Sequence, residues 1–203
     1  MRQSSKEFVG ICAKTLLIRE PIYEFGSLQV PGQEGYSDLR VFFPRKSYVG
    51  SDVRQGKGVD VILDLENIDL PDNSVETALC VDTLEHVECP WKAIEELHRV
   101  TRGIVIIVVP FFFRIHNYPK DYWRFTLDCL RGLLRPFESF YVSYAGTKDY
   151  PHTVIGIGFN SHNPDIYKFK LLLKKWQKQW SHSHIIIKNP IKRMSCLCRK
   201  RIG

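Results

Sequence analysis

Residues 111–124, FFFRIHNYPKDYWR, combine aromatic rings with two arginines, a histidine and an aspartate, an unusual density of reactive side chains for one segment. A histidine imidazole exchanges its proton near neutral pH, so His116 could act as a general base, and Asp121 could orient it or replace it. Arg114 and Arg124 could hold an anionic ligand, such as a carboxylate or a phosphate, in bidentate fashion. We therefore predict a ligand-binding segment, with further contacts from Tyr118, Tyr122 and Trp123.

The same segment has a structural interpretation. Asp121 and Arg124 could form an ion pair inside the loop, while the aromatic rings pack the loop onto the body of the protein. This alternative stays open above all for Arg124 and Trp123. It applies less to His116, which we predict as the base.

Acidic residues follow two of the apolar segments nearer the N-terminus. Asp52 ends the run YVGSD after Gly50, and an acid at such a strand tip can accept hydrogen bonds from both hydroxyls of a ribose. Asp64 is the last acid of VDVILDL (59–65), where it could accept a hydrogen bond from an adenine amine while Leu65 covers the ring. The alternative is that both are ordinary turn aspartates. Gly26, at the end of PIYEFG, would let the backbone turn sharply beside a ligand.

The segment VDTLEHV (81–87) follows another apolar run. We interpret His86 there as a packing or hydrogen-bonded histidine. Near the C-terminus, Cys196 and Cys198 do not combine with His182 and His184 in a known zinc-binding spacing. We predict no metal site.

The elements that position these residues alternate between strand and helix. Apolar, β-branched or aromatic runs predict strands, and apolar positions three or four residues apart predict helices. The expected strands are 21–26, 47–52, 59–65, about 75–81, 103–110, 137–146 and 152–159. The expected helices are 4–19, 37–43, 90–100, 125–134 and 166–180. This order predicts an α/β protein with a Rossmann-like, doubly wound, mostly parallel sheet and helices on both faces.

The ordered set of motifs resembles the class I S-adenosylmethionine-dependent methyltransferases, and most of all the type-11 methyltransferase domain family. The resemblance covers about residues 20–160. It rests on LPDNSV before a strand, LEHV after it, a helix ending in ELHRV, the apolar strand that ends at Pro110, and FRIHNYPKDYWRFT. It implies a seven-stranded sheet with an antiparallel last strand, and S-adenosyl-L-methionine as the cofactor.

The resemblance also implies cofactor-binding roles for eight residues. In chain order these are Glu24, Gly26, Ser27, Asp52, Asp64, Leu65, Val81 and Asp82. The first three match the loop that wraps the methionine part, and Asp52 matches the acid that binds the ribose hydroxyls. Asp64 and Leu65 match the adenine side, and Val81 and Asp82 match the strand that lines the other face of the cofactor.

Two motifs depart from the family pattern. The first loop reads GSLQVPG where the family usually has GxGxG, and the Pro-Gly-Gly turn before the fifth strand is reduced to TRG (101–103). These departures favour an alternative function, a catalytically silent cofactor-binding domain that acts through protein contacts.

The C-terminal part differs in charge from the rest of the chain. Residues 166–203 contain eleven Lys and Arg and no Asp or Glu, whereas residues 1–165 carry a net charge of −4. We predict a methyltransferase domain over 1–165 and a basic tail over 166–203. The tail would begin with an amphipathic helix whose apolar stripe could lie on an anionic membrane. The alternative is a helix packed on its own body.

The composition is that of a globular protein rather than of a membrane-spanning one. The chain has 203 residues, of which 44% are hydrophobic and 25% charged, as in an ordinary globular domain, and no apolar run is long enough to span a membrane. The six cysteines form no CxxC pair, which favours reduced thiols in a cytoplasmic protein. We predict an S-adenosylmethionine-dependent methyltransferase of a small-molecule or glycan-type acceptor. A nucleic-acid methyltransferase guided by the tail ranks below it, because the body is acidic.

Overall fold

A computed structural model describes residues 1–32, 34–160 and 166–181. Its centre is a seven-stranded sheet in the order β3-β2-β1-β4-β5-β7-β6. The strands are β1 (Ile22–Phe25), β2 (Tyr48–Asp52), β3 (Val61–Ile62), β4 (Val75–Val81), β5 (Thr101–Pro110), β6 (Ser139–Gly146) and β7 (Pro151–Phe159). Only β7 runs antiparallel to its neighbours, β5 and β6. The predicted fold class, with its antiparallel last strand, is confirmed.

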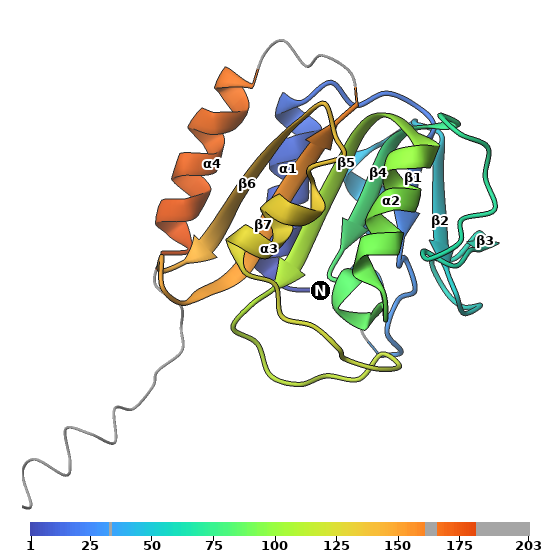
Figure 1. Ribbon diagram of the computed structural model, residues 1–203, viewed down its shortest axis with the longest axis horizontal. Coiled ribbons are helices and arrows are strands. Elements are labelled where there is room, and N and C mark those ends of the chain that lie inside the picture. Colours follow the sequence, from blue (N-terminus) through green and yellow to red (C-terminus); the bar gives the residue numbers. More distant parts are fainter. Residues whose placement is uncertain (33, 161–165, 182–203) are drawn as a thin grey trace, which may run out of the picture.

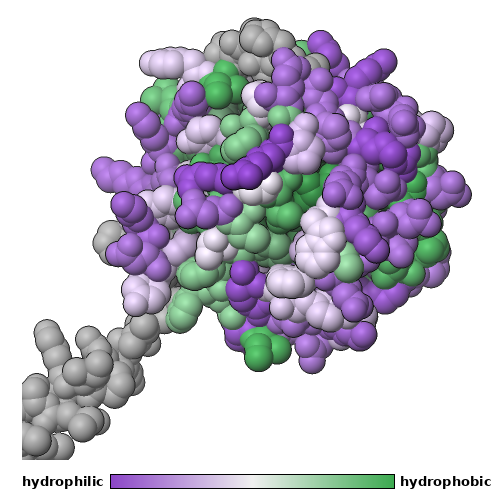
Figure 2. Space-filling view, in the orientation of Figure 1, coloured by the Kyte–Doolittle hydropathy of each residue, from purple (hydrophilic) through white to green (hydrophobic). Residues whose placement is uncertain are grey.

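Helices cover both faces of the sheet (Figure 1). On one face lie α1 (Gln3–Thr15) and α4 (Tyr167–Gln179), and on the other lie α2 (Pro90–Val100) and α3 (Leu127–Leu133). The strand β5 is buried along almost its whole length between these two layers, as its β-branched sequence predicts. Hydrophilic side chains cover most of the face shown in Figure 2, with apolar ones exposed between them.

Several elements are shorter than predicted. The helix α1 ends at Thr15 because Leu16 is already extended. The third strand keeps only Val61 and Ile62, because Asp64 accepts a hydrogen bond from the Glu66 amide at 2.9 Å and turns the chain. The expected helix over 37–43 is a single 3-10 turn, Arg40–Phe42.

The predicted apolar stripe of the tail does not face a membrane. Phe169, Leu173 and Trp176 of α4 are buried in the same core as Phe8 of α1. The Trp176 indole also donates a hydrogen bond to the Ser4 carbonyl at 3.1 Å. The expectation of an exposed stripe is therefore wrong for α4, because a complementary apolar face on α1 covers it. Residues 182–203, including both tail cysteines, lie outside the described residues, and a domain boundary at 165 stays a prediction.

No helix in the described ranges has the length and apolar character needed to cross a membrane.

Candidate active site

A cavity of about 740 Å³ opens at the carboxyl ends of β1, β2 and β4. In this sheet β1 and β4 are adjacent, and the chain leaves them toward opposite edges, which is where doubly wound sheets bind ligands. The wall is made by the loops after these strands, by Met1 and Arg2, and by part of the segment 110–122. Segments far apart in the sequence thus meet around a single space.

All eight residues predicted to bind the cofactor line this cavity. In chain order they are Glu24, Gly26, Ser27, Asp52, Asp64, Leu65, Val81 and Asp82. They come from the ends of β1, β2 and β4 and from the turn after β3. The sequence placed them one strand at a time, and the topology brings them together.

Gly26 sets how closely the first loop approaches β4. Its φ of +91° lies in the region that favours glycine, and a Cβ at this position would stand 2.1 Å from the Thr83 hydroxyl oxygen. Beyond it the loop turns toward residues 56–58. The Ser27 hydroxyl donates to the Gly58 carbonyl at 2.9 Å, and the Gln29 amide donates to the Lys57 carbonyl at 2.9 Å. The loop GSLQVPG is therefore held by its own contacts, and Leu28 joins the cavity wall.

Asp52 ends β2 at the cavity wall. Both the backbone amide of Arg54 and its Nε donate to Asp52 Oδ1, at 3.0 and 3.3 Å. Asp64 is exposed and Leu65 is buried beside it, so a polar group and an apolar side chain stand together at this end of the cavity. This is the arrangement that the sequence predicted for a ribose and an adenine.

Glu24 is a buried carboxyl group in β1, with only 3% of its surface exposed. The Tyr48 hydroxyl donates a hydrogen bond of 2.6 Å to its Oε2. Burial raises the pKa of Glu24 to about 7, because the charged form loses its hydration and Tyr48 and Arg40 offset only part of that loss. Glu24 can therefore hold a proton near neutral pH.

Asp82 follows β4 with a positive φ of 50° and binds the N-terminal segment. Arg2 donates to it from Nη2 at 2.6 Å and from the backbone amide at 3.3 Å. Burial disfavours the charged carboxylate, but the charges of Arg2 and of the N-terminal ammonium outweigh this, so the pKa of Asp82 is lowered. Arg2 also lies over the Phe113 ring, with its guanidinium carbon 5.3 Å from the centroid. No sequence pattern pointed to Arg2, because its partners are remote along the chain.

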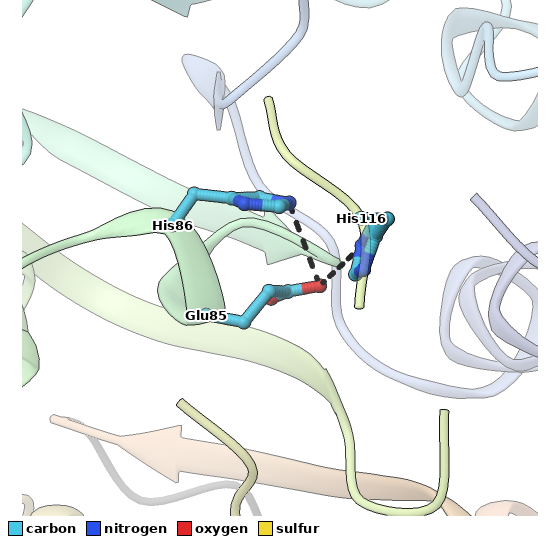
Figure 3. A group of neighbouring side chains, drawn as sticks. All are labelled: Glu85, His86 and His116. Atoms are coloured by element: carbon cyan, nitrogen blue, oxygen red, sulfur yellow. Dashed lines mark ion pairs between the residues drawn. The ribbon is translucent and has the colours of Figure 1, made fainter. Parts of the chain in front are cut away.

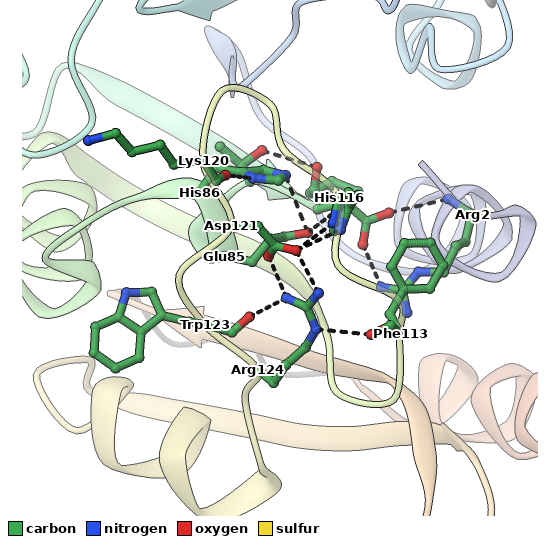
Figure 4. A network of polar contacts seen from close by, with 12 residues as sticks. Arg2, Glu85, His86, Phe113, His116, Lys120, Asp121, Trp123 and Arg124 are labelled. Atoms are coloured by element: carbon green, nitrogen blue, oxygen red, sulfur yellow. Dashed lines mark hydrogen bonds and ion pairs between the residues drawn. The ribbon is translucent and has the colours of Figure 1, made fainter.

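The predicted site residues of the segment 111–124 divide into two groups, and Figure 4 shows Asp121 and Arg124 of the second group joined by polar contacts. Four of its predicted site residues line the cavity: Arg114, His116, Tyr118 and Tyr122. Asp121, Trp123 and Arg124 do not line it. They brace the loop, as the structural alternative proposed.

The brace centres on the Asp121 carboxylate, which is 1% exposed. It accepts from Arg124 Nη2 at 2.7 Å and from the His116 amide at 2.7 Å. These hydrogen bonds, Arg124 first, hold the pKa of Asp121 well below its usual range. Arg124 also donates to the Arg114 carbonyl at 2.9 Å, and the Trp123 indole donates to the Val87 carbonyl at 2.9 Å. The Arg124 guanidinium is therefore engaged inside the loop, whereas Asp121 Oδ2 lies 3.2 Å from His116 Nδ1 and could orient that ring.

Sequence reasoning missed Glu85, which lies in the 3-10 turn Leu84–His86 after β4. Its side chain is fully buried, and neither carboxylate oxygen has a hydrogen-bond partner among the described residues. Its Oε1 stands 3.8 Å from His116 Nε2 and 3.9 Å from His86 Nε2 (Figure 3). Burial first, and then the charge of Asp82, raise the pKa of Glu85 to about 8. A glutamate in a turn gave no local signal of such burial.

His86 was predicted to be a packing or hydrogen-bonded histidine, and the structure confirms the hydrogen bond. Its Nδ1 is hydrogen-bonded to the Lys120 carbonyl, and its ring lies against the His116 ring with centroids 4.9 Å apart. Burial lowers the pKa of His86. His86 and Glu85 both line the cavity, at the end that holds His116.

Comparisons with known proteins agree with the resemblance found in the sequence. Residues 46–108 match the family model described as "Methyltransferase domain", of the type-11 family. No curated protein matches the chain in sequence.

Several solved structures share the fold. A possible histamine N-methyltransferase from Thermotoga maritima, described as SAM-dependent, aligns with a TM-score of 0.54 at 20% identity, over 77% of this chain and 92% of that one. The N-terminal domain of EvdMO1 with SAH bound aligns with a TM-score of 0.57 at 16% identity, over 78% and 82%. A chain from a complex of the Trm112 methyltransferase activator with a methyltransferase of Haloferax volcanii aligns with a TM-score of 0.53 at 14% identity, over 78% and 90%.

Proposed function

We propose that this chain transfers a methyl group from S-adenosylmethionine to a small acceptor held beside the segment 111–124. Its fold and its match to the family model support a class I S-adenosylmethionine-dependent methyltransferase. One observation carries the proposal. The eight residues that the resemblance assigned to the cofactor line one cavity, and four of the predicted site residues in the acceptor segment line the same cavity.

The residues present fit S-adenosyl-L-methionine. Gly26 gives the first loop a close approach to β4, which leaves backbone rather than a side chain beside the methionine part. Asp52 would accept the ribose hydroxyls, and Asp64 and Leu65 would contact the adenine amine and ring. When bound, the cofactor supplies a methyl group on a sulfonium, and a structure with SAH bound shares this fold.

The chain contributes to methyl transfer by positioning and enclosing the acceptor. Methyl transfer is an in-line displacement, so the main requirement is that the acceptor atom be held in line with the methyl group. Arg2, Arg114 and Tyr118 line the acceptor end, and the Asp121–Arg124 brace fixes the course of the loop around it. A cavity of about 740 Å³ shared with the cofactor suits a small-molecule or glycan-type acceptor.

Two parts of this proposal rest on the sequence alone. The reduced thiols predicted from the cysteine pattern support a cytoplasmic location, and Cys12, Cys80, Cys89 and Cys129 are free in the structure. Contact with an anionic membrane would depend on the basic residues after 181, because the stripe of α4 is buried.

The test is cofactor affinity in two aspartate variants. Asp52→Ala should weaken binding of S-adenosylhomocysteine by about 1–3 kcal/mol, or roughly five- to 150-fold, because a charged hydrogen bond to each hydroxyl is lost. Asp69→Ala is the matched control, because Asp69 is exposed and does not line the cavity. Equal affinity in both folded variants would remove Asp52 from the site. No binding of S-adenosylhomocysteine by the parent protein would contradict both the methyltransferase and the silent cofactor-binding alternative.

A further inference from the structure

Three side chains at the acceptor end of the cavity point their ligand atoms at one another: Glu85, His86 and His116 (Figure 3). One ligand atom from each lies within 4.8 Å of the other two. We infer that these residues bind a divalent transition-metal ion. Metal binding itself does not depend on the proposed function, whereas the role given to the ion below rests on it.

The hydrogen bonds of His86 and His116 engage Nδ1 of each ring and leave each Nε2 available to bind a metal ion. His86 Nδ1 faces the Lys120 carbonyl. His116 Nδ1 lies 3.2 Å from the Arg114 carbonyl and 3.2 Å from Asp121 Oδ2. All these partners are acceptors, so each neutral ring carries its proton on Nδ1 and a lone pair on Nε2. A carbonyl or carboxylate behind the ring is the usual arrangement of histidine metal ligands, since it fixes the tautomer and the ring orientation.

Glu85 supplies a carboxyl ligand that the protein leaves unsatisfied. Its carboxyl group is fully buried, and its oxygens have no hydrogen-bond partner in the described part of the chain. The distances of 3.8 and 3.9 Å to the two Nε2 atoms are too long for hydrogen bonds. An uncompensated buried carboxylate is costly, and a cation between it and two nitrogen lone pairs would satisfy all three groups.

The spacing fits an ion after a small adjustment. Bonds of about 2.0–2.1 Å to nitrogen and oxygen in a tetrahedral site put neighbouring ligand atoms about 3.4 Å apart. Each Nε2 would therefore move about 0.4–0.5 Å closer to the Glu85 oxygen, and the two histidine ligand atoms, within the 4.8 Å that bounds the group, would move up to about 1.4 Å closer to each other. Two imidazoles and one carboxylate favour Zn²⁺ or another first-row divalent ion over Mg²⁺ or Ca²⁺, which prefer oxygen ligands.

Three protein ligands leave a position open toward the cavity that all three residues line. An acceptor hydroxyl bound there would be oriented, and its proton would be more acidic. This assigns His116 to metal binding in place of the free general base that the sequence predicted. The two roles are distinguishable, because only the first requires a metal.

The experiment measures Zn²⁺ binding to the full-length protein after treatment with a chelator. Because the tail contains two cysteines and two histidines of its own, the background is the Cys196→Ser/Cys198→Ser protein. We expect it to bind one Zn²⁺ in equilibrium dialysis, and to bind Co²⁺ with visible absorption bands. Glu85→Gln and His116→Ala should each weaken Zn²⁺ binding at least about tenfold. Glu85→Gln keeps the shape of the buried side chain, and His116→Ala changes a loop residue, so each variant serves if the other fails to fold.

Two control variants show whether the loss is specific. Glu88→Gln removes a carboxylate from the same cavity outside the cluster, and His98→Ala removes a histidine outside the cavity. Both should bind Zn²⁺ like the background. Background protein without Zn²⁺ binding, or cluster variants that bind as tightly as the controls, would overturn the inference. S-adenosylhomocysteine binding is measured on the same samples. In the background protein, absence of S-adenosylhomocysteine binding alone counts against the proposed function, and absence of Zn²⁺ binding alone counts against the metal site.

Discussion

Replacing Glu24 by glutamine should change how the stability of the protein depends on pH. Burial raises the pKa of Glu24 from 4.5 to about 7 in the folded state. The folded protein therefore keeps a proton on Glu24 that the unfolded chain releases at lower pH. The stabilising contribution is fully present below about pH 4.5 and is lost as the pH rises through 7. Glutamine has no such proton and can still accept the hydrogen bond from Tyr48.

The size of the effect follows from the two pKa values. Each unit of difference corresponds to about 1.4 kcal/mol, and integration between pH 5 and pH 8 gives about 2.5 kcal/mol for this shift. The free energy of unfolding of Glu24→Gln minus that of the parent should rise by this amount over that interval. Urea unfolding at both pH values measures it.

Taking the difference between the two proteins cancels the other titrating groups, Glu85 included. A difference that stays constant within about 0.5 kcal/mol, or that falls with pH, would show that Glu24 is hydrated or already ionised in the folded protein.

Two further predictions concern the loop after β1 and the helix α4. Gly26→Ala should destabilise the protein by about 1–3 kcal/mol more than Gly35→Ala. Both glycines have positive φ, but an added Cβ would meet Thr83 at Gly26 and would meet nothing within 4 Å at Gly35. Equal losses of stability in urea unfolding would contradict the close approach of the loop to β4. Trp176→Ala should cost about 3–5 kcal/mol, while Lys178→Ala, on the exposed side of the same helix, should cost less than about 0.5 kcal/mol; similar small losses would show that α4 does not belong to the core.

The sequence was sufficient for the sheet because its signals are local. The β-branched run of β5, Pro90 at the start of α2, and the acids after β2 and β3 each act through neighbours a few residues away. The family resemblance assigned the cofactor residues one strand at a time. Because the carboxyl ends of parallel strands lie along one edge of the sheet, all eight line one cavity, and their role in cofactor binding stays a prediction.

The features that the sequence did not predict depend on contacts between segments that are far apart in the chain. Arg2 reaches Asp82 across 80 positions, and the Trp176 indole reaches Ser4 across 172. The burial of Glu85 depends on how the segment 111–124 folds back: the Tyr122 and Trp123 amides donate to the Glu85 carbonyl at 2.8 and 3.3 Å. No periodicity or spacing encodes these contacts, so the sequence left open whether α4 packs on the body, and Glu85 was overlooked.

The central claim is that the cavity at the ends of β1, β2 and β4 is a cofactor site, and calorimetric titration of the full-length protein with S-adenosylhomocysteine tests it most directly. The account predicts saturable binding of one molecule per chain, competed by S-adenosylmethionine and weakened by Asp52→Ala but not by Asp69→Ala. A folded protein that binds neither compound would contradict it.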